Sequence, residues 1–426
     1  QVLLHVCAGN VSLVMGCLAS TDRRTIPDSE AFFEKYALCK KIGEGAFGQV
    51  RLATSLATKK VYAVKVADVR ARTTDPNHTP ISTKRRNTIQ REIAMWTLAS
   101  QAAVPEITKL VDCFYSSGFY YMVCEACSKN LMQHLLHVKT ISEDELGDVT
   151  AQMLRGISHM HNIGLVHRDV KPENFLFGGP NDAVLKLCDF GLVLRQPKKG
   201  RKLMGVGGTA PYMAPEILIT GNSGWAGHRA GYDKEIDMWA MGVILYLVLY
   251  GQFPYMPSGE ATAESMKQAI KQDLPPLRFE HSQAQTALSL VKLLLVRNPS
   301  ERATTEQAAQ HPFVARAARP PSGAEMEISV SQAKEVAEKL RDFKVDAATQ
   351  AELEGRLKAM TAARGGVWFS ESEALSPTHS QSSAAFRESR IKKDKKPVSR
   401  DKFGTHSGVV SEQQKEIETR ADQWTT

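Results

Sequence analysis

The feature of this sequence that most limits its fold is a glycine-rich stretch followed at once by an extended run. Gly43, Gly45 and Gly48 have the spacing G-x-G-x-x-G, which occurs in dinucleotide-binding folds and also by chance. In a dinucleotide site the third glycine opens a helix, whereas here Val50 continues an extended run and residues 61–66 alternate as a second strand. No Lys-Ser/Thr pair follows Gly48, as a P-loop requires. We therefore expect a hairpin whose glycine tip can approach phosphate groups.

Composition excludes several classes of protein. The chain has 426 residues, 42% apolar and 23% charged, which rules out wholesale disorder, a collagen-like rod and a many-span membrane protein. The longest apolar run, 238–250, has 13 residues, too few to cross a bilayer, and predicts a buried helix. The seven cysteines lack the spacing of a disulfide framework, which indicates a reducing compartment.

Six motifs follow one another in an order that resembles the eukaryotic protein kinases. They are Tyr62-Ala63-Val64-Lys65, His167-Arg168-Asp169 with Lys171 and Asn174, Asp189-Phe190-Gly191, Ala214-Pro215-Glu216, the helix start at Asp237, and Arg302 as the partner of Glu216. The resemblance covers residues 38–313, about 276 of 426. It implies a two-lobed α+β fold, with a small β-rich N-lobe (38–124) that carries one key helix and a larger, mainly helical C-lobe (125–313).

Each motif supplies a group that phosphoryl transfer requires, because that reaction depends on positioning and on neutralising charge. The resemblance implies an ATP-dependent serine/threonine kinase in which Asp169 accepts the proton of the substrate hydroxyl or orients that hydroxyl. Lys171 would neutralise the transferring phosphate, and in the family a lysine there favours Ser/Thr over Tyr. Lys65 would contact the nucleotide phosphates. Asn174 and Asp189 offer oxygen ligands for two Mg²⁺ ions.

Lys65 needs a carboxylate to hold it in place, and one helix offers a candidate. Ile89, Ile93 and Trp96 recur at i, i+4 and i+7, the spacing of an apolar helix face. Glu92 borders this stripe. We therefore expect an ion pair between Lys65 and Glu92, in preference to a solvated glutamate on the helix surface.

The resemblance also assigns the residues around the nucleotide. Cys124 corresponds to the residue at the back of the adenine pocket, residues 125–127 to the hinge between lobes, and residues 128–130 replace an acidic ribose contact of many relatives. The spacing of Cys124 and Cys127 has no second pair, so it does not indicate a metal site, and Cys188 is expected to be an inert buried thiol. The expected ATP-binding residues are Gly43, Gly45, Gly48, Val50, Ala63, Lys65, Glu125, Cys127 and Leu176.

Two segments are most similar to the calcium/calmodulin-dependent and calcium-dependent kinases: residues 172–177 and 298–313. In that group Glu173 often contacts a basic residue upstream of the acceptor, and Thr209 shapes the acceptor pocket. No EF-hand loop occurs in the sequence. Residues 325–364 carry 7 Lys/Arg and 8 Asp/Glu, unlike the basic helices that bind calmodulin. We expect this stretch to dock on the large lobe or to block the cleft instead of binding calmodulin.

The activation loop between Gly191 and Thr209 lacks any residue that could be phosphorylated. Residues 192–208 contain no Ser, Thr or Tyr, although Arg168 would by resemblance receive a phosphate from this loop. The sequence therefore predicts activity without loop phosphorylation. The main alternative is a pseudokinase, a nucleotide-binding scaffold, whose usual sign is loss of the residues at positions 65, 169, 174 or 189. None of these is lost.

Charge and the two ends of the chain give the remaining expectations. The net charge of +8 would suit a nucleic-acid-binding protein, but no helix-turn-helix, RNA-binding or zinc motif is present. Residues 195–202 and 387–402 each carry +5, which leaves −2 elsewhere, so we expect protein substrates, no nucleic acid, and contact between the second run and an anionic membrane.

The segments before and after the kinase-like region differ from it and from each other in composition. Met15-Gly16-Cys17-Leu18-Ala19-Ser20 matches the N-myristoylation pattern, with Cys17 available for palmitoylation. We interpret 1–37 as a leader with translation starting at Met15, which implies a cytoplasmic protein anchored to membranes by acylation. Residues 314–365 are expected to be a helical extension and 366–426 a disordered Ser/Lys-rich tail.

Overall fold

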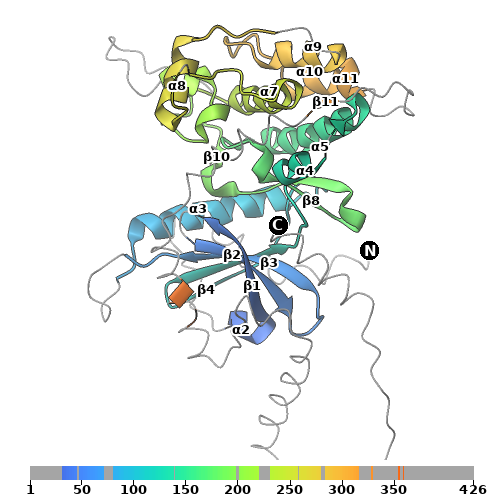
Figure 1. Ribbon diagram of the computed structural model, residues 1–426. Helices are drawn as coiled ribbons and strands as arrows, with labels where there is room; N and C mark the ends of the chain where they lie inside the picture. Colours follow the sequence, from blue (N-terminus) through green and yellow to red (C-terminus); the bar gives the residue numbers. More distant parts are fainter. Residues whose placement is uncertain are drawn as a thin grey trace, which may run out of the picture.

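The computed structural model has two lobes, one built on a β-sheet and one mainly helical (Figure 1). It describes residues 31–45, 48–71, 80–138, 140–197, 201–219, 231–257, 259–279 and 284–315, together with 328–329, 354–355 and 358. The expected acylation residues Gly16 and Cys17, and the Ser/Lys-rich tail, lie outside these ranges. The two-lobed α+β fold is the one expected from the sequence.

The small lobe is a five-stranded antiparallel sheet with the strand order β1-β2-β3-β5-β4. A short helix, α2 (Ala31–Lys35), leads directly into the first strand, so the ordered lobe begins before the expected boundary at residue 38. The strands are β1 (Tyr36–Gly45), β2 (Gly48–Ser55), β3 (Val61–Asp68), β4 (Leu110–Ser116) and β5 (Phe119–Glu125). The glycine motif joins β1 to β2 as a hairpin with Gly45 opposite Gly48.

One long helix, α3 (Thr83–Ser100), crosses the lobe between β3 and β4. It begins where the Ser82 side chain accepts a hydrogen bond from the Arg85 amide, an N-cap that satisfies an otherwise unpaired donor. The expected stripe of Ile89, Ile93 and Trp96 is buried. Glu92 is buried with it, which places a carboxylate on the face turned toward the sheet.

The large lobe is built around two long helices, and both have clear end signals. Helix α5 (Glu143–Asn162) starts with a capping box between Ser142 and Glu145. Helix α7 (Glu235–Tyr250) contains the long apolar run, which is buried from Ile236 to Val248, and it ends at Gly251 with φ 64°. Among the residues that the structure describes, no helix is long and apolar enough to cross a membrane.

Short elements complete the large lobe. Two pairs of short antiparallel strands, β8 with β9 and β7 with β10, flank the catalytic-loop and Asp189 motifs in the sequence. A last strand, β11, pairs with β6. The elements are α4 (Leu131–His137), β6 (Thr140–Ile141), β7 (Leu165–Val166), η1 (Pro172–Asn174), β8 (Phe175–Gly178), η2 (Pro180–Asp182), β9 (Val184–Leu187), η3 (Phe190–Leu192), β10 (Leu194–Arg195), η4 (Ala210–Tyr212), α6 (Pro215–Ile219), α8 (Ala263–Gln272), α9 (Gln285–Leu294), α10 (Thr305–Gln310), α11 (Pro312–Ala315) and β11 (Ile328–Ser329).

Candidate active site

A lysine of the small lobe contacts two carboxylates from different parts of the chain. The Nζ atom of Lys65 on β3 lies 2.6 Å from Glu92 Oε1 on α3 and 3.0 Å from Asp189 Oδ1, which follows β9. The expected pair with Glu92 is therefore present in the structure. Asp189 adds a second carboxylate from the large lobe, so this one ammonium group links the two lobes.

The electrostatics of this cluster keep its members charged. Burial alone would lower the pKa of Lys65, but Asp189 and Glu92 outweigh burial and raise it. Lys65 in turn lowers the pKa of Asp189 to about 2. Burial raises the pKa of Glu92, and the nearby Lys65 partly offsets that effect. At neutral pH the cluster holds a cation and an anion side by side, as a site for phosphate and metal requires.

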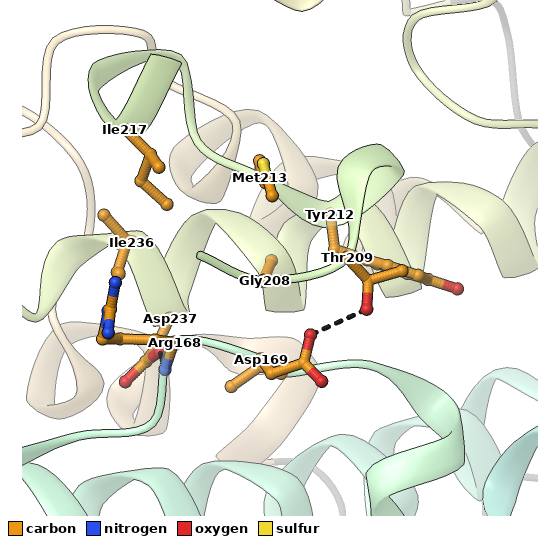
Figure 2. A pocket seen from close by; sticks show the side chains of 11 residues that line it. Arg168, Asp169, Gly208, Thr209, Tyr212, Met213, Ile217, Ile236 and Asp237 are labelled. Atoms are coloured by element: carbon orange, nitrogen blue, oxygen red, sulfur yellow. Dashed lines mark hydrogen bonds between the residues drawn. The ribbon is translucent and has the colours of Figure 1, made fainter. Parts of the chain in front are cut away.

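The second cluster joins the catalytic-loop motif to the activation segment (Figure 2). The Thr209 hydroxyl donates a 2.7 Å hydrogen bond to Asp169 Oδ1. The Nζ atom of Lys171 lies 2.8 Å from Asp169 Oδ2 and donates to Thr209 Oγ1 at 2.9 Å. The side-chain amide of Asn174 donates to the carbonyl and carboxylate oxygens of Asp169, at 2.8 and 3.2 Å. Three residues predicted from the sequence thus surround the carboxylate of a fourth, Asp169.

A buried aspartate on α7 holds the catalytic loop in this shape. Asp237 accepts hydrogen bonds from the backbone amides of His167 and Arg168, both at 2.9 Å, and from the His161 ring, also at 2.9 Å. Arg168 itself has φ 70°, a left-handed conformation that needs such support. His167 is fully buried, and its ring bonds the Cys188 carbonyl at 3.0 Å. The structure therefore gives His167 a packing role, as expected.

The expected nucleotide-binding strand residues lie on one face of the sheet. Val50 pairs with Lys65 across β2 and β3, and Ala63 lies two positions from Lys65, so all three face the same side. Gly48 has a further reason to be glycine, because a Cβ atom there would lie 1.7 Å from the Val66 carbonyl oxygen. The packing of β2 against β3 therefore requires glycine at position 48, independently of any contact that Gly48 makes with a ligand.

At the hinge the side chains are turned into the protein. The Glu125 carboxylate accepts from the Lys109 amide at 2.8 Å and pairs with Lys186 at 3.1 Å. Cys127 is buried beneath Gly178 of β8, where a Cβ atom would lie 2.9 Å from its sulfur. The hinge therefore offers its backbone to a ligand, while Leu176 on the half-buried face of β8 completes the expected set. Lys186 holds the Glu125 side chain through this ion pair, and no motif in the sequence predicts that role.

The residues that replace the acidic ribose contact have structural partners. Ser128 is buried and bonds the Phe177 carbonyl through its amide at 2.8 Å. Asn130 caps α4 in a capping box with Gln133.

Burial raises the pKa of Cys188 well above its ordinary value, with Asp189 adding to the effect. This agrees with the expectation of an inert thiol.

Backbone carbonyls surround the arginine of the catalytic loop. The Arg168 guanidinium donates to the Leu192 carbonyl at 3.3 Å and to the Gly205 carbonyl at 3.4 Å, and it lies 5.6 Å from the Tyr232 ring. The Tyr232 hydroxyl donates to the same Gly205 carbonyl at 2.7 Å. Sequence reasoning missed Tyr232, since it lies 27 residues from Gly205 with no motif around it.

Two buried polar atoms near Asp169 have no hydrogen-bond partner among the described residues: Glu173 Oε2 and the Tyr212 hydroxyl. Burial raises the pKa of both groups, and the negative charge of Glu173 adds to the rise for Tyr212. Unpaired buried polar atoms are costly and call for an explanation. Tyr212 was not predicted as a site residue.

Comparison with known proteins places this geometry in a family. The protein kinase domain model matches residues 36–314. The delta subunit of calcium/calmodulin-dependent protein kinase type II from Oryctolagus cuniculus is 29% identical over 289 residues, which cover 67% of this chain and 50% of that protein. The liver/testis isoform of phosphorylase b kinase gamma catalytic chain from Bos taurus is 32% identical over 298 residues, covering 68% of this chain and 70% of that one.

This chain therefore belongs to the protein kinase family, and these relatives place it among the serine/threonine protein kinases. Its matched segment begins at Tyr36, where β1 begins. The chain spans half the length of the first relative named above and 70% of the second.

Kinases of this family use ATP and Mg²⁺, and the residues present suit both. Because Asn174 bonds Asp169 through its amide nitrogen, its amide oxygen stays available as a ligand. Asp189 is ionised and 46% exposed at its side chain. No cluster of three or more His, Cys, Asp or Glu suited to a metal occurs among the described residues. The two oxygen ligands of Asn174 and Asp189 suit Mg²⁺, which usually takes one or two protein oxygens plus phosphates and water.

Proposed function

We propose that this chain transfers the γ-phosphoryl group of ATP to serine and threonine hydroxyls of protein substrates. The observation that carries the proposal is the cluster of Lys171, Thr209 and Asn174 around the Asp169 carboxylate. Such a cluster fixes a base and a cation within one hydrogen bond of each other, which is the positioning that phosphoryl transfer requires.

Each residue has a defined task in the proposed reaction. Asp169 accepts a hydrogen bond from the substrate hydroxyl and takes its proton as the oxygen attacks the γ-phosphorus. Lys171 neutralises charge on the transferring phosphoryl group. Lys65, held by Glu92, binds the α- and β-phosphates. Asn174 and Asp189 would hold two Mg²⁺ ions, whose positive charge would help to neutralise the phosphates.

The proposed nucleotide site uses the face of the small-lobe sheet that carries Lys65. The glycine hairpin with Gly43 and Gly45 covers the phosphates, and the side chains of Val50, Ala63 and Leu176 enclose the base. The backbone of residues 125–127 bonds the base edge. Support comes from the shared face of the strand residues and from the inward turn of the Glu125 and Cys127 side chains.

We propose that substrates carry a basic residue upstream of the acceptor. The unpaired Glu173 Oε2 is a buried acceptor without a described hydrogen-bond donor, and a guanidinium or ammonium would satisfy it. The Tyr212 hydroxyl beside it would accept a second hydrogen bond. A peptide array in which upstream Arg is replaced by Ala tests this: unchanged rates would refute the proposal.

We propose that the enzyme is active without phosphorylation of its activation segment. The carbonyls of Leu192 and Gly205 and the ring of Tyr232 already surround the Arg168 guanidinium, which supports a loop held by its own backbone. The test is intact-mass analysis of active enzyme, with phosphatase treatment as the second arm. A phosphate on Thr209 or Tyr212 of the activation segment whose removal abolishes activity would contradict the proposal.

The proposed localisation is the cytoplasmic face of a membrane. It is supported by the myristoylation pattern at Gly16, the neighbouring Cys17 and the basic run at 387–402. Gly16→Ala should move the protein from the membrane to the soluble fraction, with Thr25→Ala, outside the acylation pattern, as the control. Equal distribution of wild type and Gly16→Ala would refute it.

One assay separates the kinase from a nucleotide-binding scaffold. Wild type and Asp189→Ala are compared on peptide libraries with Mg-ATP, and nucleotide binding is measured on the same samples. The kinase reading requires phosphopeptide product from wild type and at least a thousandfold less from Asp189→Ala, on the order of the loss seen when charge-stabilising groups are removed. Binding of nucleotide without product from wild type would establish the scaffold.

A further inference from the structure

The side of the small-lobe sheet that faces away from Lys65 forms a second surface. In the register of β2, β3 and β5, Arg51 lies opposite Val64 and Val64 opposite Val123, so they share a face. Val50 and Lys65 occupy the other face. We call the surface the outer face and define it by Gln49, Arg51, Val64, Val66, Tyr121 and Val123.

The outer face is buried along its length. Val64, Val66, Tyr121 and Val123 are fully buried. Helix α2 covers one end, where Phe32 stacks on Tyr121 with ring centroids 4.3 Å apart. Surface that is removed from water must be covered by other parts of the chain, and α2 has only five residues.

The buried guanidinium of Arg51 on the outer face indicates which other segment of the chain covers that face. The Arg51 side chain is 2% exposed. Its hydrogen bonds include two to neutral acceptors, the Cys39 carbonyl at 2.7 Å and Gln49 Oε1 at 2.9 Å. A buried guanidinium is costly unless an anion lies near it. Glu354, more than 300 positions along the chain, lies 4.0 Å from Arg51 Nη1 and is 44% exposed.

The residues around Glu354 have the pattern of a segment that covers an apolar surface. Glu354 and Gly355 are helical. In the sequence Leu353, Leu357 and Met360 recur at i, i+4 and i+7, the spacing of one helix face. Earlier in the same stretch, Ile328–Ser329 pairs with β6 of the large lobe.

We propose that the outer face is the docking site of the chain's own C-terminal segment, residues 350–361, with Glu354 over Arg51. The segment contacts the small lobe on the side opposite Lys65, so docking leaves the nucleotide side of the sheet open. This differs from both sequence-based expectations for the stretch, docking on the large lobe and blocking the cleft, and it makes the segment a support for β1–β3.

Photocross-linking tests where the segment lies. Lys358 is exposed and one helical turn from Glu354, so p-benzoylphenylalanine replaces it in the full chain. The proposal requires intramolecular cross-links to peptides from residues 36–66. Cross-links to large-lobe peptides alone, cross-linked dimers, or no cross-link to this chain would each overturn it, and dimers would identify a second copy as the occupant.

Hydrogen exchange tests the ion pair without disturbing a buried group. In the full chain, Glu354→Arg should speed exchange of amides in β2 and β3 about fivefold, the factor that corresponds to about 1 kcal/mol. Glu325→Arg, the same charge change elsewhere in the stretch, is the control and should have no effect there. Equal exchange in wild type and Glu354→Arg would overturn the proposal.

Discussion

The Thr209 hydroxyl donates a 2.7 Å hydrogen bond to the carboxylate of Asp169, across 40 residues of sequence. Lys171 bonds both partners, so the three side chains form a closed triangle. The contact fixes the rotamer of Asp169 from the side of the activation segment. It makes the position of the proposed base depend on the fold of that segment.

Loss of the Thr209 hydroxyl should therefore reduce turnover. Hydrogen bonds to charged groups contribute about 1.5–3 kcal/mol, so Thr209→Ala should lower kcat about 10- to 100-fold. Thr209→Ser keeps the hydroxyl and is the matched control, with kcat within about threefold of wild type. Steady-state kinetics on one peptide substrate measure both. Equal kcat for the alanine and serine variants would show that the hydrogen bond has no part in turnover.

Removal of the Glu92 charge should displace Lys65 toward Asp189. Glu92→Gln is expected to lower kcat/KM about 10- to 100-fold, because a misplacement of about 1 Å costs that much. Arg91→Ala, on the exposed side of the same turn, is the control. The assay is paired with nucleotide binding by calorimetry, which should weaken for Glu92→Gln only. A Glu92→Gln enzyme as active as Arg91→Ala would contradict the role of this ion pair.

The preference for an upstream basic residue should depend on pH. Burial raises the pKa of Glu173, so its carboxylate is charged only above that raised value. The ratio of kcat/KM for an Arg-containing peptide over its Ala counterpart should be highest near pH 8. It should fall on acidification, beginning at a higher pH than an ordinary glutamate would give. Asp189, with its pKa lowered to about 2, stays ionised throughout.

The control for this pH dependence is Glu173→Gln, for which the ratio should be small and constant between pH 8 and pH 5. Only the ratio is diagnostic, because other groups change the absolute rates of both peptides together. A wild-type ratio that does not change over this range would show that Glu173 does not recognise the basic residue.

The ion pair between Arg302 and Glu216 should contribute to stability. Arg302 Nη1 and Nη2 lie 2.6 and 3.1 Å from the two Glu216 oxygens, and the arginine side chain is fully buried. Glu216→Gln should cost about 3–5 kcal/mol, because it leaves a buried charge without its partner. Glu264→Gln breaks an exposed pair with Lys267 and should cost less than about 1 kcal/mol. Urea unfolding of the two variants compares them, and equal midpoints would contradict the prediction.

Short patterns predicted the elements that position the site. The glycine spacing followed by an extended run predicted the β1–β2 hairpin, and the i, i+4, i+7 stripe predicted α3 with Glu92 on its border. These predictions succeeded because strand alternation and helix periodicity are local properties. Helix α2 was not predicted, since the burial of Phe32 depends on contacts with Tyr121 and Phe114, which lie far along the chain.

Contacts between distant segments had no sequence signal. Tyr232 contacts Arg168, and Lys186 holds the hinge through Glu125. The charge of Glu173 acts on Tyr212, whose hydroxyl has no hydrogen-bond partner among the described residues. None of these pairs has a fixed separation along the chain. Their partners are brought together only when the activation segment and the β8–β9 hairpin pack on the large lobe.

The sequence by itself determined the family and the chemical groups: Lys65, Asp169, Lys171, Asn174 and Asp189 were identified from motif order, because each motif is a short stretch of local backbone. Only the tertiary structure decided how these groups are held. Three contacts join segments that lie far apart in the chain. They are the hydrogen bond from Thr209 to Asp169, the hydrogen bonds from Arg168 to backbone carbonyls, and the contact of Glu354 with Arg51. Packing in three dimensions brings such segments together, and no periodicity along the sequence records it.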